Sequence, residues 1–248
     1  MPNAREIRAW YNRHYASQGL SGMRPREAYP GFLDLLDAAP APAPAPAPGR
    51  RLLDVSCGTG FLLRAATGRG LGAVGVDLSD QATRIAREAA PRSAVAVSSA
   101  EALCLRSGVF DYVTCLGSLE HFLDMRQGLR EMRRVARPGA RFCIMVPNRD
   151  FLAWKLGAGT GTAQQDINEN LQTLAEWRAL FDESGFREVR VLADWWHAER
   201  LRRRSGSAAA RLKGLLLGTL WRWLPLRLEY QFIFILESAA DPGALSAS

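Results

Sequence analysis

From residue 50 onward, short apolar runs alternate with amphipathic segments. The apolar runs lie near 51–56, 73–77, 93–98, 110–116 and 140–146, and the amphipathic segments near 60–68, 80–90 and 124–136. Short, nearly continuous apolar runs are typical of strands buried on both faces of a sheet. Strands that alternate with helices predict a parallel sheet with helices on both sides. We therefore expect a doubly wound α/β fold, with Pro138 and Gly139 marking the turn into the fifth strand.

The same pattern continues towards the C-terminus. A helix is expected over 173–184, because Thr173 and Glu176 have the spacing of a capping box and Gly185 follows the last turn. Strands are expected at 187–194 and 228–237. About thirty-three residues separate these two strands, where a hairpin of two to five would be enough. This long insertion is the second unusual feature of the chain.

The insertion, residues 197–227, is both basic and apolar. An apolar helix is expected near 212–224, beside Arg211, Lys213 and Arg222 and ended by Pro225. At about thirteen residues it is too short to cross a bilayer, which takes about twenty. Three alternatives follow: a lid packed on the domain, a helix at a membrane surface or a lipid substrate, and a surface for a protein or RNA.

The N-terminal region differs in pattern from the rest. Residues 3–37 predict one or two helices with aromatic and apolar anchors, which we interpret as a helical cap over residues 1–39. Alternating Ala and Pro fill 40–49, a composition that excludes helix and predicts an extended linker, with a docking site for a partner as the alternative. The remaining residues, 50–248, are expected to form one α/β domain that includes the insertion.

A glycine turn follows the first predicted strand. Leu52 to Val55 end in Ser56 and Cys57, and Gly58 and Gly60 then lead into a helix. Glycine permits a tight turn, and amides at a helix start suit a carboxylate or phosphate. Asp77 ends the second strand nineteen residues after Gly58, where an acid accepts hydrogen bonds from ribose hydroxyls. The two signals together predict a nucleotide site.

Two common nucleotide motifs do not fit this turn. Dinucleotide-binding sequences carry a third glycine three residues after the second, and Leu63 stands at that place. A phosphate-binding loop of the Walker type needs Gly-Lys-Ser or Gly-Lys-Thr, and this turn contains no lysine.

The segment Leu53-Asp54-Val55-Ser56-Cys57-Gly58-Thr59-Gly60 instead resembles the first motif of the class I S-adenosylmethionine-dependent methyltransferases, with Ser56 in place of the usual glycine. The resemblance continues through 77–79, 99–103, 110–113 and 133–139 and covers roughly residues 50–195. It implies a mostly parallel seven-stranded sheet of order 3-2-1-4-5-7-6 with the last strand antiparallel. Among these families, the small-molecule and quinone methyltransferases are the most similar.

The resemblance also implies where S-adenosylmethionine binds and S-adenosylhomocysteine is released. Asp54 and the turn from Gly58 to Gly60 would hold the methionine part, Asp77 the ribose, and the segment after the third strand the adenine. Ser99 stands where many relatives have aspartate, and its hydroxyl could bond the adenine amino group. The residues expected at the cofactor are Tyr15, Asp54, Ser56, Cys57, Gly58, Gly60, Asp77, Leu78, Ser99, Ala100, Glu101 and Leu116.

Candidate residues for the methyl acceptor lie near the same strand ends. His121 follows the fourth strand and is the candidate general base, because neutral imidazole suits that task near pH 7; alternatively it only closes the cofactor pocket. Tyr11 and Tyr15 would either fold over the cofactor or pack in the cap. Asn148 and Arg149 follow the fifth strand and are expected to point into the crevice, and His197 would follow the sixth.

Composition bears on where the charge lies, on metal binding and on the location of the protein. The net charge of +7 equals the excess of eight basic residues over one acid in 197–227, so the rest of the chain is neutral on balance. The four cysteines form no CxxC pair and the three histidines are scattered, so no metal site is expected. The first residues carry no apolar run, which predicts a cytoplasmic protein, with peripheral membrane contact through 197–227 as an alternative.

We therefore expect methyl transfer to oxygen, nitrogen or carbon of a small, apolar or lipid-like acceptor. The alternatives are an RNA methyltransferase, weakened because Leu116-Gly117-Ser118-Leu119 replaces the Pro-Pro motif of enzymes that methylate base amino groups, and a non-catalytic scaffold that binds a partner or membrane through 197–227.

Overall fold

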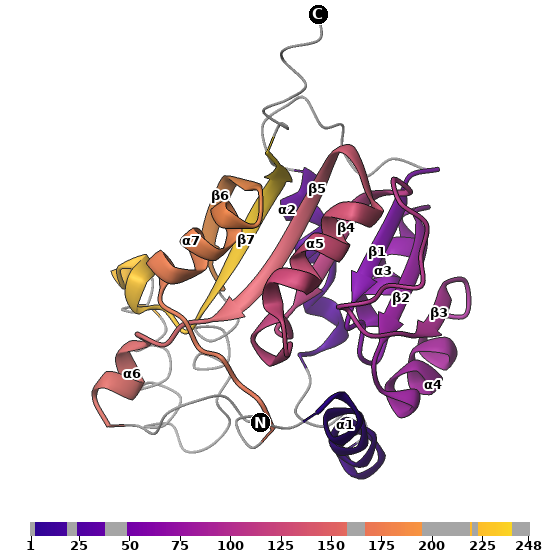
Figure 1. Cartoon of the computed structure of the whole chain (residues 1–248), viewed down its shortest axis with the longest axis horizontal. Helices are drawn as coiled ribbons and strands as arrows, with labels where there is room; N and C mark the ends of the chain where they lie inside the picture. The colour runs from indigo at the N-terminus through magenta and orange to yellow at the C-terminus, as the bar shows by residue number, and fades with distance from the viewer. Residues whose placement is uncertain are drawn as a thin grey trace, which may run out of the picture.

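The computed structural model describes residues 3–18, 24–37, 49–157, 167–194, 219 and 223–239. Seven strands form one sheet in the order β3-β2-β1-β4-β5-β7-β6 (Figure 1). β7 runs antiparallel to both of its neighbours, β5 and β6, and all other neighbouring strands in this sheet are parallel. The predicted order and the antiparallel last strand are confirmed. The strands are β1 Arg51–Val55, β2 Gly72–Asp77, β3 Ala94–Val97, β4 Phe110–Leu116, β5 Ala136–Pro147, β6 Phe186–Ala193 and β7 Gln231–Ser238.

Helices cover both faces of the sheet, as expected for a doubly wound fold (Figure 1). The core of one face contains buried side chains of α5 and α7, and the core of the other contains those of α2, α3 and α4. The described helices are α1 Ala4–Gln18, α2 Pro30–Asp37, α3 Phe61–Gly68, α4 Asp80–Ala89, α5 Met125–Val135, α6 Leu152–Lys155 and α7 Leu174–Glu183, with short 3-10 turns η1 Arg26–Ala28, η2 Leu119–His121 and η4 Leu226–Leu228.

The two N-terminal helices occupy different places. Phe32, Leu33 and Leu36 of α2 are buried in the core beside α3 and β5. α1 instead packs on α4, close to the ends of the central strands (Figure 1). Of the predicted linker 40–49, only Gly49 lies within the described residues. The cap therefore consists of one helix built into the core and one that lies on it.

Strand β5 begins earlier than the sequence suggested. Ala136 already pairs with Phe110 of β4, and the register shifts before Arg141 pairs with Tyr112. The exposed Pro138 and Gly139 form this irregularity, with Gly139 at φ +76°. The predicted turn is thus a bulge within the strand, because pairing with β4 resumes on both sides of it.

The capping box predicted for the last helix is present in α7. Thr173 Oγ1 accepts from the amide of Glu176, and the Glu176 carboxylate accepts from the amide of Thr173. Within the described residues, no helix has both the length and the apolar character needed to cross a membrane.

Candidate functional site

A cavity of about 350 Å³ opens at the carboxyl ends of the central strands. It lies where the strand order reverses between β1 and β4, the place where open α/β sheets bind ligands. Its size is within the range of small-molecule sites. The structure brings together eleven of the twelve residues predicted at the cofactor: Tyr15, Asp54, Ser56, Cys57, Gly58, Asp77, Leu78, Ser99, Ala100, Glu101 and Leu116.

The turn after β1 adopts a left-handed backbone at a residue that is not glycine. Ser56 has φ 58°, the only positive φ of a non-glycine residue among those described. Such a conformation costs an L-residue about 1 kcal/mol or more relative to glycine. Glycine would adopt this backbone conformation without strain, whereas Ser56 adopts it with strain and lines the cavity.

Gly60, the twelfth predicted residue, does not line the cavity. It precedes the first turn of α3 as its N-cap, with φ 77°. A Cβ on Gly60 would lie 3.0 Å from Cα of Ala86, so the glycine lets α3 approach α4. Its part in the site is to shape the turn.

The amides of this turn are largely used within the protein. Gly58 N donates to Asp77 Oδ2 at 2.9 Å, Cys57 N to the carbonyl of Val76, and Gly60 N to the carbonyl of Cys57. The expectation that the amides of this turn are open to a ligand carboxylate is therefore wrong for Cys57, Gly58 and Gly60. Their role is to fix the turn against β2.

Asp77 ends β2 with both carboxylate oxygens oriented by backbone amides. Oδ1 accepts from Ser79 N at 2.8 Å, and Oδ2 accepts from Gly58 N. Burial raises the pKa of Asp77 to about 6, and these amide hydrogen bonds oppose the shift. Each oxygen keeps a second lone pair for a ligand hydroxyl.

Asp54 is oriented by a residue that the sequence did not single out. Thr114 pairs with Asp54 across β1 and β4, and its hydroxyl donates to Asp54 Oδ1 at 2.6 Å. Burial raises the pKa of Asp54 to about 7, the hydroxyl of Thr114 lowers it, and Asp77 raises it further. Two buried acids on neighbouring strands favour a ligand with positive charge.

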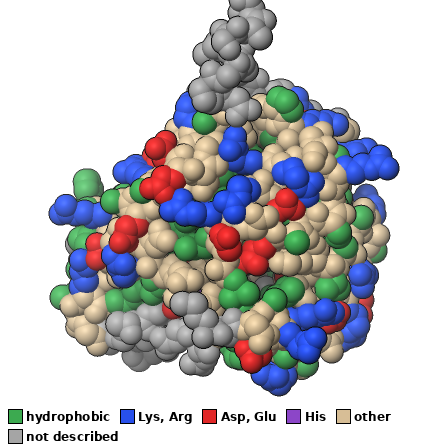
Figure 2. Space-filling view, viewed as in Figure 1, with side chains coloured by type: hydrophobic (Ala, Val, Ile, Leu, Met, Phe, Trp, Pro, Cys, Tyr) green, Lys and Arg blue, Asp and Glu red, His purple; other side chains and the backbone are tan. Residues whose placement is uncertain are grey.

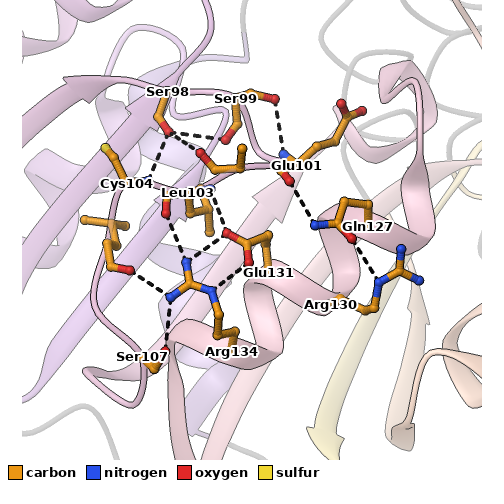
Figure 3. Close-up of polar contacts among 12 residues, drawn as sticks. Ser98, Ser99, Glu101, Leu103, Cys104, Ser107, Gln127, Arg130, Glu131 and Arg134 are labelled. Atoms are coloured by element: carbon orange, nitrogen blue, oxygen red, sulfur yellow. Dashed lines mark hydrogen bonds and ion pairs between the residues drawn. The ribbon is translucent and has the colours of Figure 1, made fainter.

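The segment after β3 is held in place by α5 (Figure 3). Arg134 donates to the carbonyls of Leu103 and Leu105 and pairs with Glu131, whose carboxylate accepts from Leu103 N at 2.7 Å. Gln127 donates to the carbonyl of Glu101. These contacts set the wall that Ser99, Ala100 and Glu101 form on one side of the cavity.

One face of α1 closes the cavity on the opposite side. Ala4, Ile7, Tyr11 and Tyr15 follow helical spacing and all line it. Burial raises the pKa of both tyrosines, and the nearby acids add to the effect. Both phenols therefore stay neutral at physiological pH.

A second face of α1 is bound to the start of α4. Asn12 Oδ1 accepts from Ser79 Oγ at 2.7 Å, and Asn12 Nδ2 donates to Asp80. Arg8 pairs with Asp80 at 2.6 Å. Ser79 also caps α4 and binds Asp77 through its amide. A chain of hydrogen bonds thus links Asp77 to α1.

His121 lies in η2 at the cavity wall and is buried. Its Nδ1 is 2.5 Å from the carbonyl oxygen of Asn168, and the Asn168 side chain donates to the carbonyls of His121 and Phe122. Because a carbonyl only accepts, Nδ1 carries the hydrogen and Nε2 of the neutral ring is left to accept a proton. Tyr11 packs edge-on at 6.3 Å between ring centroids.

Glu120, which the sequence analysis did not select, lies beside His121 in the same turn. It is 2% exposed and lines the cavity. Its Oε1 is 3.7 Å from Nε2 of His121, and its Oε2 has no hydrogen-bond partner. Burial raises the pKa of Glu120 to about 7. The only signal in the sequence was its position next to the candidate base.

Two of the residues expected at the acceptor lie elsewhere. Asn148 is fully buried and its side chain donates to the carbonyls of Arg227 and Glu229, so it joins β5 to the start of β7. Arg149 pairs with Glu176 and lines a separate surface depression between α5 and α7. The expectation that both point into the crevice is corrected. His197 lies outside the described residues.

An arginine that the sequence analysis passed over lines the cavity in their place. Arg24 forms a bidentate pair with Asp194 at the end of β6, with its guanidinium 5.2 Å from the ring centroid of Phe32. The two charged side chains are 9% and 1% exposed. Among the described lining residues, Arg24 is the only arginine or lysine, and its charge is balanced by Asp194.

The described surface over α5 has no patch made of basic side chains alone or of acidic side chains alone. Figure 2 shows basic and acidic side chains interspersed on this face, and Arg126, Arg130 and Arg137 each lie in an ion pair. Within the described residues, no cluster of His, Cys, Asp or Glu could hold a metal ion. Most of the basic insertion 197–227 lies outside them, so its predicted roles stay predictions.

Comparison with known proteins shows what the central part of the chain resembles. Residues 53–144 match the family model of the methyltransferase domain. These residues, less than half of the chain, resemble a methyltransferase domain. The ubiquinone biosynthesis O-methyltransferase of Idiomarina loihiensis is 34% identical over 114 residues, which cover 44% of this chain and 47% of that protein. The protein of the same name from Methylococcus capsulatus is 37% identical over 113 residues, 44% and 48% of the two chains. The match spans about half the length of these relatives.

Several solved structures share the fold of this chain at low sequence identity. Geranyl diphosphate C-methyltransferase of Streptomyces coelicolor has a TM-score of 0.65 at 12% identity and covers 96% of this chain and 99% of its own. Phosphoethanolamine N-methyltransferase 2 of Haemonchus contortus has 0.63 at 18%, covering 96% and 60%. The cyclase SpnF has 0.65 at 17%, covering 97% and 98%. Because one of them is a cyclase, the fold alone does not fix the reaction.

Proposed function

We propose that the protein is an S-adenosylmethionine-dependent methyltransferase that acts on oxygen of a small, largely apolar acceptor. The observation that carries the cofactor is the pair of buried acids, Asp54 and Asp77, at the switch point of a methyltransferase sheet. Oxygen as the acceptor atom is supported by the relatives named ubiquinone biosynthesis O-methyltransferase.

The lining of the cavity fits the cofactor. Asp77 would accept hydrogen bonds from the ribose hydroxyls, through the lone pairs that the amides of Gly58 and Ser79 leave open. Asp54, held by Thr114, would face the positively charged methionine part. Ser99 to Glu101 would border the adenine, with the hydroxyl of Ser99 at hand for its amino group. When bound, the cofactor supplies an activated methyl group on a sulfonium.

The protein would mainly align the acceptor and exclude water. Methyl transfer is an in-line displacement, so positioning of the reacting atoms does much of the catalysis. Tyr11 and Tyr15 of α1 form the roof of the cavity. His121 is proposed to take up the proton that the acceptor releases, directly or through a neighbouring group, because its tautomer leaves Nε2 ready to accept a proton.

The acceptor is proposed to be apolar and without strong negative charge. Phe122, Leu123, Met145 and Tyr230 also line the cavity and add apolar surface to it. Arg24, already paired with Asp194, offers little to an acceptor carboxylate or phosphate. The predicted peripheral membrane contact through 197–227 would suit such an acceptor and belongs to this proposal.

Calorimetric titration with S-adenosylmethionine and S-adenosylhomocysteine tests the proposal first. Asp77→Asn should weaken both by about a hundredfold, because hydrogen bonds to a charged group contribute about 1.5–3 kcal/mol each and 1.4 kcal/mol is a factor of ten. Asp182→Asn, on the exposed side of α7, is the matched control and should bind as the wild type does. Failure of the folded wild type to bind either compound would refute the proposal.

Methyl transfer from labelled cofactor to catechol, long-chain phenols and prenylated quinols then tests the reaction. The labelled methyl group should appear on the phenol or quinol oxygen, as a methyl ether. Label in RNA alone would favour the RNA methyltransferase alternative. Cofactor binding without any transfer, with a partner captured through 197–227, would favour the scaffold.

A further inference from the structure

Glu120 carries a hydrogen-bonding atom that the protein leaves unused. Its Oε2 is buried and has no hydrogen-bond partner among the described residues, and Glu120 itself lines the cavity. A buried polar atom without a partner costs about 1–3 kcal/mol, so such atoms are rare in folded proteins. A donor from a ligand in the cavity would satisfy it.

The turn that holds Glu120 is rigid. The carbonyl of Glu120 accepts from Asn170 N at 2.8 Å, and the amides of His121 and Phe122 close the 3-10 turn. Asn168 fixes the next two carbonyls through its side chain. Contacts between two segments thus fix the backbone at Glu120, and its side-chain carboxyl group takes no part in them.

The charged and titratable groups around Glu120 come from four elements. His121 lies on its own turn, Tyr11 on α1, Cys115 on β4 and Glu169 on the 167–170 segment. Burial raises the pKa of Glu120 to about 7, His121 lowers it and Glu169 raises it. Tyr11 and Cys115 stay neutral because burial raises the pKa of each.

We propose that Glu120 Oε2 binds the hydroxyl group of the methyl acceptor and receives its proton, and that His121 Nε2 takes the proton onward. This rests on the proposed function and names the atom that would meet the acceptor. His121 then acts through Glu120, as the second base of a pair, rather than as the first.

The acceptor oxygen forms a bond to the methyl carbon, the carbon–sulfur bond breaks, and its electron pair stays on sulfur. The O–H bond of the acceptor breaks and its proton passes to the Glu120 carboxylate, which becomes a carboxylic acid. A half-turn of the carboxyl group then brings the protonated oxygen to the present place of Oε1, which is 3.7 Å from Nε2. The proton passes to Nε2 once this gap closes to hydrogen-bond length, and the Asn168 carbonyl stabilises the imidazolium.

Infrared difference titration tests the group without any turnover. In protein loaded with S-adenosylhomocysteine, we expect a carboxylic acid band that titrates near pH 7 and is missing in Glu120→Gln. Glu169→Gln should move this titration to lower pH, because it removes a negative neighbour, and His121→Gln should move it to higher pH. A wild-type spectrum identical to that of Glu120→Gln between pH 5 and pH 8 would overturn the proposal.

Kinetics with catechol as acceptor give the second readout. Glu120→Gln should lower kcat/KM about a hundredfold or more and lose the rise towards pH 7, while it keeps wild-type affinity for S-adenosylhomocysteine. Glu120→Asp should restore part of the rate, because it returns a carboxylate. His121→Gln should keep a rise with pH, displaced upward.

The outcomes separate this proposal from the function on which it rests. A wild type that neither binds S-adenosylhomocysteine nor methylates catechol would remove both. A wild type that methylates catechol at a rate and with a pH profile that Glu120→Gln reproduces would remove the role of Glu120 alone.

Discussion

A Cβ on Gly75 of β2 would lie 2.5 Å from Cδ1 of Leu63 on α3 and 2.8 Å from Sγ of Cys57. Leu63 stands where dinucleotide-binding sequences have their third glycine, which lets helix and strand pack closely. Here the space is made on the strand instead, because Gly75 leaves room for the leucine. The pair explains why this glycine turn tolerates a bulky residue on the first turn of its helix.

Gly75→Ala should therefore destabilise the fold. The added methyl group would overlap Leu63 and Cys57 in a packed core, and such overpacking costs about 1–3 kcal/mol of unfolding free energy. Gly72→Ala is the control, because a Cβ at this end of the same strand meets its nearest neighbour at 3.6 Å. Urea unfolding measures both, and equal stability of the two variants would contradict the packing described.

Ser56→Gly should stabilise the protein. Glycine adopts φ 58° without the clash that serine suffers, so the unfolding free energy should rise by up to about 1 kcal/mol. Ser56→Ala keeps the strained backbone and removes only the hydroxyl, which makes it the matched variant. If thermal unfolding ranked Ser56→Gly below Ser56→Ala, the hydroxyl rather than the backbone would govern this turn.

Stability should fall as pH rises through the slightly acidic range. Burial raises the pKa of Asp54 from its ordinary value near 4 to about 7, so the folded state holds a proton that the unfolded chain has released. This contribution is present below about pH 4 and is lost as pH rises to about 7. Asp54→Asn should reduce the fall, and at pH 8 it should unfold at higher urea than the wild type.

Asp80 gives a control of opposite sign. The hydrogen bond from Arg8 lowers the pKa of Asp80 to about 2, so its contribution is present above its ordinary value near 4 and is lost below it. Asp80→Asn should lower stability at neutral pH and have less effect at pH 3. Unfolding curves in which Asp54→Asn and Asp80→Asn respond to pH alike would disprove the assignment of the two carboxylates.

Asn12→Ala should loosen α1. The change removes the acceptor for Ser79 and the donor to Asp80, while Tyr11 and Tyr15 keep their places on the same helix. We expect S-adenosylhomocysteine to dissociate about tenfold faster in stopped-flow measurements, the equivalent of about 1.4 kcal/mol. Arg13→Ala, which leaves the polar contact with α4 intact, should dissociate as the wild type does; a matching increase there would mean that helix stability, not this contact, sets the rate.

The sequence was sufficient for the sheet and for many of the residues that line the cavity. The strands themselves follow from local patterns, whereas the strand order and the antiparallel β7 were implied by the family resemblance, which short motifs of consecutive residues carry. It was not sufficient where a side chain depends on distant partners. Asn148 was expected in the crevice because it follows a strand, yet carbonyls some eighty residues away hold it in the core.

The residues that the sequence analysis missed share this property. Thr114 matters because it lies beside Asp54 across two strands, Arg24 because Asp194 receives its charge, and Asn12 because α1 folds back on α4. None of these contacts can be predicted from the local sequence pattern, because each joins residues that are far apart in the chain. Glu120 stood next to a candidate base, but only the fold shows that its Oε2 is buried without a partner.

The hydrogen-bond chain from Asp77 through Ser79 to Asn12 has a consequence for turnover. The helix that covers the cavity is hydrogen-bonded to Ser79, whose amide binds the proposed ribose carboxylate, so the cofactor product would leave only after this hydrogen bond opens. Opening of such covers, rather than bond making, often limits the rate of enzymes. An initial burst of methylated product followed by a slower steady state would be the kinetic signature of this helix.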